Sequence, residues 1–176
     1  MDIDKCIKDR RSVREYKNKK VSSKDVSKII ESGTYAPCAG NIQNYSFIVV
    51  SDDKKKEAIA RASDQTWMLD ASTFVVVCNN KDKIKKFYEE EGDHYAIQNC
   101  AAVTQNMLLT ACSLGISSCW VGSYDEIQLR RILKLPDNIN VESIVVLGYS
   151  DDKPKTPKRL PLNKITYFEN FGNSLK

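Results

Sequence analysis

The chain has 176 residues, of which 41% are hydrophobic and 28% are charged. These values predict one globular domain over residues 1–176 and exclude disordered, collagen-like and coiled-coil chains. No apolar run reaches the roughly 18–20 residues that span a bilayer, and the first residues lack the apolar part of a signal peptide, so we expect a cytoplasmic protein. The net charge of +4 is too small to favour a nucleic-acid-binding protein.

Cysteine spacing and the single histidine limit the possible chemistry. None of the six cysteines forms a C-x-x-C pair, and most lie inside apolar runs. We therefore expect reduced, mostly buried thiols and no zinc or redox motif. His94 is the only histidine, which excludes a His-rich metal site.

Apolar periodicity predicts helices and strands that alternate along the chain. Helices are expected over 3–10, 22–33, 54–62, 81–90, 93–114 and a segment beginning at Asp125, and buried strands over 47–50, 74–78, 118–122 and 141–149. The proline-rich tail after residue 153 is expected to be extended. Interleaved elements without a flexible linker predict one mixed α/β domain.

Two helices carry further signals. Ser22 and Asp25 resemble a capping box at the start of the second helix, and Asp52 or Asp53 is expected to cap the third. The 93–114 helix is apolar on nearly all sides. Such a helix is either central in a monomer or faces a partner subunit.

Basic residues gather near both ends of the chain. They are Lys8, Arg10, Arg11 and Arg14, and then Lys153, Lys155, Lys158 and Arg159. Arginines offer forked donors suited to phosphate, so the two clusters could converge on one anion, or they could be two solvated faces. Neither a G-x-G-x-x-G motif nor a Walker loop is present, so any phosphate would be held mainly by side chains.

Four segments, 10–14, 36–43, 114–122 and 159–162, occur in an order that resembles the flavin-dependent nitroreductase family. The resemblance covers nearly the whole chain. It implies an α+β sandwich, with a central mixed sheet flanked by helices, in an intertwined homodimer. In such a dimer two FMN sites lie at the subunit interface, and the C-terminal tail wraps the partner.

The resemblance also implies roles for particular residues. The implied FMN-binding residues are Arg10, Arg11, Ser12, Arg14, Pro37, Cys38, Asn41, Gln43, Val121, Gly122 and Arg159. Arg10, Ser12 and Arg159 would bind the phosphate, and Arg14 would reach the pyrimidine side of the flavin. Pro37, Cys38 and Asn41 would come from the partner subunit. Val121 and Gly122 would lie beside the central ring, with a backbone N–H near N5.

The implied activity is that of an FMN-dependent NAD(P)H oxidoreductase. Hydride would pass from NAD(P)H through the flavin to a nitroaromatic, a quinone, a flavin or another small acceptor by a ping-pong mechanism. No side chain is expected to be an obligatory catalytic acid, although Arg14 would favour the reduced flavin electrostatically. No metal, nucleic-acid or membrane partner is expected.

Other functions stay open on the sequence alone. One is a flavoprotein of the same fold with another reaction, such as dehalogenation or flavin fragmentation. Another is an FMN carrier or sensor without turnover. A basic module for RNA is a third, which the modest charge and scattered aromatic residues disfavour.

The chain also departs from the family pattern. Cys38 stands where many relatives carry Ser, and Asn44-Tyr45 replaces a frequent Pro-Trp. The short segment 79–93 predicts a smaller or more open lid. Asp64, Gln65 and Trp67 lie where some relatives contact the flavin or substrate.

Three further expectations concern packing. Trp120 lies in an apolar run and is expected in the core, and Lys54–Lys56 is expected to be a solvated helix face. Tyr167, Phe168 and Phe171 in the tail are expected to anchor it on a neighbouring surface.

Overall fold

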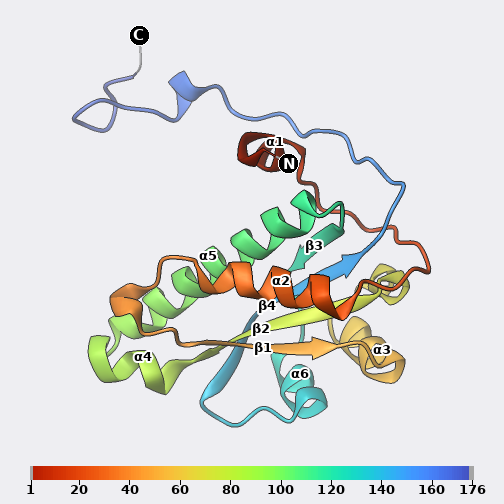
Figure 1. Ribbon diagram of the computed structural model, residues 1–176. Coiled ribbons are helices and arrows are strands. Elements are labelled where there is room, and N and C mark those ends of the chain that lie inside the picture. Colours follow the sequence, from red (N-terminus) through yellow and green to blue (C-terminus); the bar gives the residue numbers. More distant parts are fainter. Residues whose placement is uncertain (1, 175–176) are drawn as a thin grey trace.

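A four-stranded sheet forms the centre of the computed structural model, which describes residues 2–174 (Figure 1). The strands are β1 (Tyr45–Val50), β2 (Thr73–Asn80), β3 (Ser117–Val121) and β4 (Ile139–Gly148), in the order β1-β2-β4-β3. Every neighbouring pair of these strands is antiparallel. The α+β class is thus confirmed, but the expected mixed sheet is not seen among these strands. Parallel pairing in the described residues is limited to the isolated bridge between Ser12 and Ser118.

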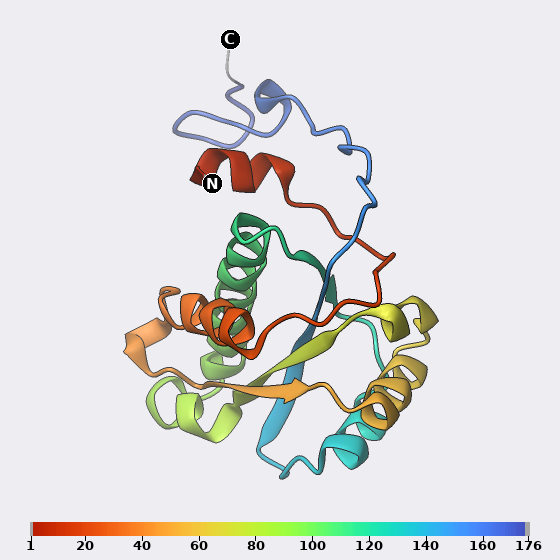
Figure 2. The same cartoon turned by 45° about the vertical axis from the view of Figure 1, so that its right-hand side comes forward.

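Helices cover both faces of this sheet (Figure 2). They are α1 (Ile3–Asp9), α2 (Ser23–Thr34), α3 (Asp53–Ala62), α4 (Lys81–Tyr88), α5 (Glu91–Ser113) and α6 (Glu126–Leu133), with short 3-10 turns η1 (Ala39–Asn41), η2 (Thr66–Asp70) and η3 (Leu162–Lys164). On one face α2 and α5 pack on β2 and β4, and on the other face α3 and α6 do so. The central strands are therefore buried on both sides, which is why their sequences are continuous apolar runs.

Side-chain caps fix where four helices begin, namely α2 at Ser22, α3 at Asp52, α4 at Asn80 and α6 at Asp125. The Ser22 Oγ accepts the Asp25 N–H at 3.1 Å, and Asp52 accepts the Lys55 N–H at 2.9 Å. The Ser22 hydroxyl also donates a hydrogen bond to the Asp25 carboxylate at 2.7 Å. The predicted caps are confirmed, because each of these oxygens satisfies an amide that has no partner within its helix.

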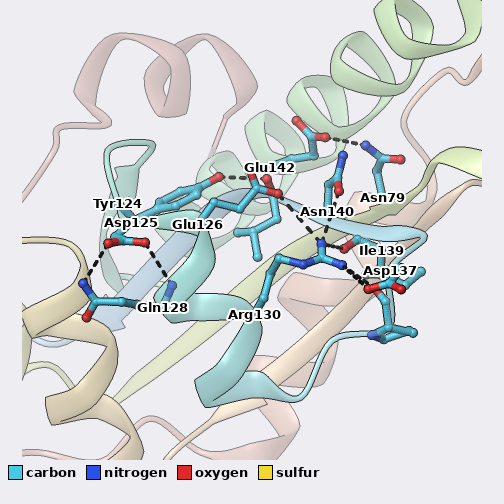
Figure 3. Close-up of polar contacts among 12 residues, drawn as sticks. Asn79, Tyr124, Asp125, Glu126, Gln128, Arg130, Asp137, Ile139, Asn140 and Glu142 are labelled. Carbon is cyan, nitrogen blue, oxygen red and sulfur yellow. Dashed lines mark hydrogen bonds and ion pairs between the residues drawn. The ribbon is translucent and has the colours of Figure 1, made fainter.

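The turn between α6 and β4 is closed by one arginine (Figure 3). Arg130 donates to the carbonyl oxygens of Ile139 at 2.6 Å and Pro136 at 2.8 Å. On the sheet itself, Asn79 of β2 donates to the Glu142 carboxylate of β4 (Figure 3). Three main-chain and side-chain acceptors thus hold the end of the sheet that adjoins α6.

The packing expectation for Trp120 is wrong, and that for Lys54–Lys56 is wrong at Lys56 but confirmed at Lys54 and Lys55, which are exposed. Trp120 is 37% exposed because β3 is an edge strand and alternate residues of a strand point to opposite faces. Lys56 is only 7% exposed, and its Nζ donates to the Ala71 carbonyl oxygen at 2.9 Å and pairs with Asp53 at 3.0 Å. Successive residues of a helix point about 100° apart, so a run of three lysines cannot all face solvent equally.

Apolar side chains remain exposed outside the core. Ile97 on α5 is 57% exposed, although the opposite side of that helix is buried against the sheet. The tail leads from β4 past α1 and away from the sheet (Figures 1 and 2). It exposes Leu160, Leu162, Ile165, Phe168 and Phe171. Among residues 2–174, no helix is both long and apolar enough to cross a membrane.

The closest approach of α2 to α5 depends on Gly33. A Cβ at this position would lie 3.0 Å from the Val103 Cγ1 and 3.1 Å from the Met107 Cγ. We predict that Gly33→Ala destabilises the fold by about 1–2 kcal/mol in urea unfolding, because overpacking outweighs the gain in helix propensity. Glu31→Ala, on the exposed side of α2, is the control and should stay within about 0.5 kcal/mol of wild type. An unchanged or higher stability of Gly33→Ala would show that the two helices separate without cost.

Candidate functional site

The arginine-rich segment 10–14 runs beside the edge strand β3. The Val13 N–H donates to the Ser118 carbonyl oxygen at 3.1 Å, next to the bridge between Ser12 and Ser118. This pairing fixes the backbone of the segment, so successive side chains point to opposite sides of it. The sequence elements 10–14 and 114–122, which are far apart in the chain, are therefore brought together as expected.

Three predicted cofactor side chains affect the pKa of one thiol of β3. Burial raises the pKa of Cys119, while the Arg14 charge, a hydrogen bond from Ser12 and the Arg10 charge act in the opposite direction. These three groups therefore lie close enough to influence the same atom. Arg10, Ser12 and Arg14 form one cluster of donors along the edge of the sheet, which we call the arginine cluster.

Most charges of this cluster have no acidic partner. The ion pairs among residues 2–174 involve Lys17, Lys56, Arg61, Lys85 and Arg130. The two arginines of the cluster, Arg10 and Arg14, take part in none of them. Unneutralised guanidinium groups gathered at one place fit an anionic ligand, because such a ligand supplies the missing charge and accepts several N–H donors.

Arg11 has a different task from its neighbours. Its Nη1 donates to the carbonyl oxygens of Lys8 at 2.6 Å and Arg10 at 2.7 Å, at the end of α1. Its Nη2 donates to Thr156 Oγ1 in the tail. Arg11 thus ties the tail to the arginine cluster. Arg159 follows Thr156 by three residues, which an extended chain covers in about 10 Å.

A cavity of about 450 Å³ lies between this segment, the tail and the end of α5. Its walls carry the cations Arg10, Arg11 and Lys153 and also the carboxylates Asp9 and Asp152. The cavity therefore joins the two basic regions that the sequence placed at opposite ends of the chain. Among residues 2–174, no group of three or more His, Cys, Asp or Glu side chains is placed to hold a metal ion.

At the end of β3, Val121 and Gly122 provide few side-chain groups that could contact a ligand. Val121 is 2% exposed, main chain included, so its side chain belongs to the core. Gly122 is exposed, and the nearest atom to a Cβ built there is the Trp120 Nε1 at 3.6 Å. The backbone role expected for these two residues stays a prediction.

The loop Pro37–Gln43 is held at the other end of α5. The Ala39 N–H donates to the Asn99 Oδ1 at 3.0 Å, and Lys83 of α4 donates to the Gln43 carbonyl oxygen at 2.8 Å. Within the loop, the Cys38 sulfur accepts the Gln43 N–H at 3.2 Å. Gly40, Asn41 and Gln43 all have positive φ, between 49° and 54°. A backbone this unusual needs its surroundings to hold it in place.

Buried asparagines supply that hold, and the sequence reasoning missed them. Asn99 Nδ2 donates to the Asn44 Oδ1 at 2.8 Å, and Asn79 Nδ2 donates to the Glu142 carboxylate. Asn44, Asn79 and Asn99 are all buried, and the Asn44 Nδ2 and Asn79 Oδ1 have no partner among the described residues. The signal in the sequence was an asparagine at the centre of an apolar helix, because a buried amide is costly unless it is hydrogen-bonded.

One chain keeps the two halves of the predicted site apart. The loop is fixed to Asn99, whereas the arginine cluster lies by Cys112 at the opposite end of α5. These two helix positions are thirteen residues apart, which is about 20 Å at the rise of an α-helix. The loop and the cluster could therefore meet only if two copies of the chain supplied one half each.

Comparison with known proteins agrees with this architecture. The profile of the Nitroreductase family matches residues 7–67 and 59–149. The chain belongs to the nitroreductase family. Membership identifies it as an oxidoreductase of the nitroreductase type.

Relatives match over most of their length. A protein of Archaeoglobus fulgidus, provisionally named NADH dehydrogenase/NAD(P)H nitroreductase, is 38% identical over 159 residues, which cover 86% of this chain and 88% of the relative. The FMN reductase (NADPH) of Bacillus subtilis is 26% identical over 180 residues, covering 92% and 72% of the two chains. A nitroreductase family protein of Clostridium difficile has a TM-score of 0.86 at 28% identity, with 97% and 99% covered. The predicted fold and family are confirmed.

The asparagine anchor of the loop is open to a direct test. We predict that Asn99→Ala speeds amide hydrogen exchange of the Ala39 N–H by at least tenfold, because that amide loses its only protein acceptor. The matched control is Asn106→Ala on the same helix, whose Nδ2 donates to the Ser32 carbonyl oxygen at 3.2 Å. In the control, exchange in the loop should stay at the wild-type rate. Equal acceleration in both variants would mean general loosening of α5 and would remove Asn99 as a specific anchor.

Proposed function

We propose that the protein is an FMN-dependent NAD(P)H oxidoreductase that works as a homodimer with two shared sites. The observation that carries this proposal is the cluster of unpaired arginines along β3 in a chain of the nitroreductase family. The names of two relatives support it, since one is an FMN reductase that uses NADPH and the other an NAD(P)H nitroreductase.

The donor set fits a phosphate-bearing cofactor. A phosphate monoester carries about −1.5 to −2 charges and three acceptor oxygens, and Arg10, Ser12 and Arg159 would bind it. Arg11 holds α1 and the tail in place beside them. Arg14 would donate to the pyrimidine side of the ring system, and the main chain of Val121 and Gly122 would lie along its centre.

The partner subunit would complete each site. Its loop would bring Pro37, Cys38, Asn41 and Gln43 over the ring system, held in place by the asparagine anchor. When bound, FMN would supply the redox chemistry, taking hydride from NAD(P)H and passing electrons to a nitroaromatic, a quinone, a flavin or another small acceptor in a ping-pong sequence. The chain's own task is to bind, orient and surround it.

Exposed apolar surface supports the homodimer. Ile97 on α5 and Ile3 and Ile7 on α1 are all more than half exposed, and the tail exposes several large apolar side chains. Surface of this kind indicates a protein contact. We propose that α5 and the tail of one copy pack on the other copy, as the resemblance implied.

The first experiment is a visible spectrum of the purified protein, loaded with FMN and titrated with NADH or NADPH without oxygen. Bleaching by either nucleotide supports the oxidoreductase. A bound flavin that neither nucleotide bleaches would favour the carrier or sensor, and a protein that takes up no FMN would overturn the proposal.

Arg10→Ala and Arg159→Ala should each weaken FMN binding at least tenfold, because hydrogen bonds to a charged group contribute about 1.5–3 kcal/mol. Arg61→Ala, an exposed arginine paired with Glu57, should bind FMN like wild type.

Shared sites can be tested by mixing two defective chains. We predict that Arg10→Ala and Asn41→Leu each bind FMN poorly as homodimers. If each site takes its arginine cluster from one copy and its loop from the other, a heterodimer of these variants contains one site with both defects and one intact site. Co-expressed and doubly tagged heterodimers should then bind one FMN at wild-type affinity. Weak binding at both sites would show that the loop and cluster of a site belong to the same copy.

A further inference from the structure

The Arg14 side chain rests on an aromatic ring. Its Cζ lies 5.7 Å from the ring centroid of Trp67, which belongs to η2. Arg14 is exposed, and no carboxylate of residues 2–174 forms an ion pair with it. A cation over an aromatic face is held by the quadrupole of the ring, so its N–H donors are not consumed.

Trp67 is itself fixed from two sides. Its Nε1 donates to the Gln65 Oε1 at 3.1 Å, and its ring stacks with Tyr16 at a centroid distance of 6.3 Å and an interplanar angle of 24°. The Tyr16 hydroxyl in turn donates to the Val13 carbonyl oxygen at 2.8 Å. Val13 is the residue before Arg14, so the contacts from Arg14 to Trp67, from Trp67 to Tyr16 and from Tyr16 to Val13 form a closed circuit.

This circuit lies beside β3. The Arg14 charge opposes the rise in the pKa of Cys119 that burial causes, and it does the same for Tyr16. The Val13 amide is bonded to Ser118 of the same strand. The Arg14 guanidinium therefore lies beside the edge strand β3, which ends at Val121 and is followed by Gly122.

We propose that Trp67 is a positioning residue that holds the Arg14 guanidinium for the pyrimidine edge of the bound flavin. This inference rests on the proposed function. The ligand chemistry is a planar ring edge with carbonyl oxygens and a ring nitrogen, which gains negative charge on reduction. Arg14 would donate to that edge, and Trp67 would act only through Arg14.

An aromatic support has an effect that an acidic one would not have. A carboxylate beside Arg14 would also fix its position, but it would cancel much of its positive charge at the ligand. The Trp67 ring fixes the cation and leaves its net charge intact. The full charge then favours the reduced over the oxidised cofactor, so the midpoint potential of bound FMN depends on Trp67.

The test compares midpoint potentials of the FMN-loaded protein. Trp67→Leu should lower the preference for reduced over oxidised FMN about tenfold, which is about 30 mV for a two-electron couple. Trp67→Phe keeps an aromatic face under Arg14 and should recover most of that loss. Arg14→Gln should lower the potential at least as far, and adding Trp67→Leu to it should change nothing more. Additive shifts would mean that Trp67 acts independently of Arg14 and would overturn the proposal.

A matched control exists in the same chain. Lys19 lies 4.1 Å from the ring centroid of Tyr149, so Tyr149→Leu removes a second aromatic support of a cation. This variant should leave the potential unchanged. If Tyr149→Leu shifts it as far as Trp67→Leu does, the effect is a general response to lost packing and the proposal fails.

The flavin-free protein gives a separate readout of the contact. Trp67 and Trp120 are the two tryptophans of the chain, so Trp120→Phe leaves Trp67 as the single emitter. Arg14→Gln in that background should change the Trp67 emission spectrum, whereas Arg61→Gln should not. No change would show that the Arg14 and Trp67 side chains are not in contact in solution.

If FMN does not bind to wild type at all, the proposed function fails, whereas bound FMN with an unchanged midpoint potential in Trp67→Leu overturns only this inference.

Discussion

The length of α5 constrains the whole site. This helix holds the loop at Asn99 near its start and ends beside the arginine cluster at Cys112. A rigid helix of 23 residues cannot bring those points together. It can instead serve as a spacer of fixed length, so that two copies packed with opposed helices would place a loop over each cluster. The exposed Ile97 on the outer side of α5 is consistent with such packing.

The arginine cluster is a local imbalance of charge that the fold maintains. Like charges near one another repel, and solvent screens them only in part. Val13 is bonded to Ser118 and Arg11 to the end of α1, so the main chain and not an acid holds the cluster in place. An anion at this position would remove the repulsion and satisfy the donors together.

The sequence predicted the parts of the fold that local rules decide. Ser22, Asp52 and Asp125 cap their helices because an oxygen there satisfies a free amide. Strand direction was not predictable, because a continuous apolar run shows burial on both faces but not orientation. The burial of Lys56 was missed for a similar reason, since its acceptor at Ala71 belongs to another element.

The candidate site divides in the same way. Arg10, Ser12 and Arg14 could be proposed because their residue types already suit an anion, whereas Asn44 and Asn99 matter only through a contact between distant segments. The Asn44 Oδ1 accepts the Asn99 amide at 2.8 Å, a contact that only the folded chain brings about. Trp67 likewise does not suit a phosphate by residue type, since its single Nε1–H is donated to Gln65, yet it supports a residue that has several donors. Supports of this kind arise from contacts between distant segments, so residue types alone do not mark them.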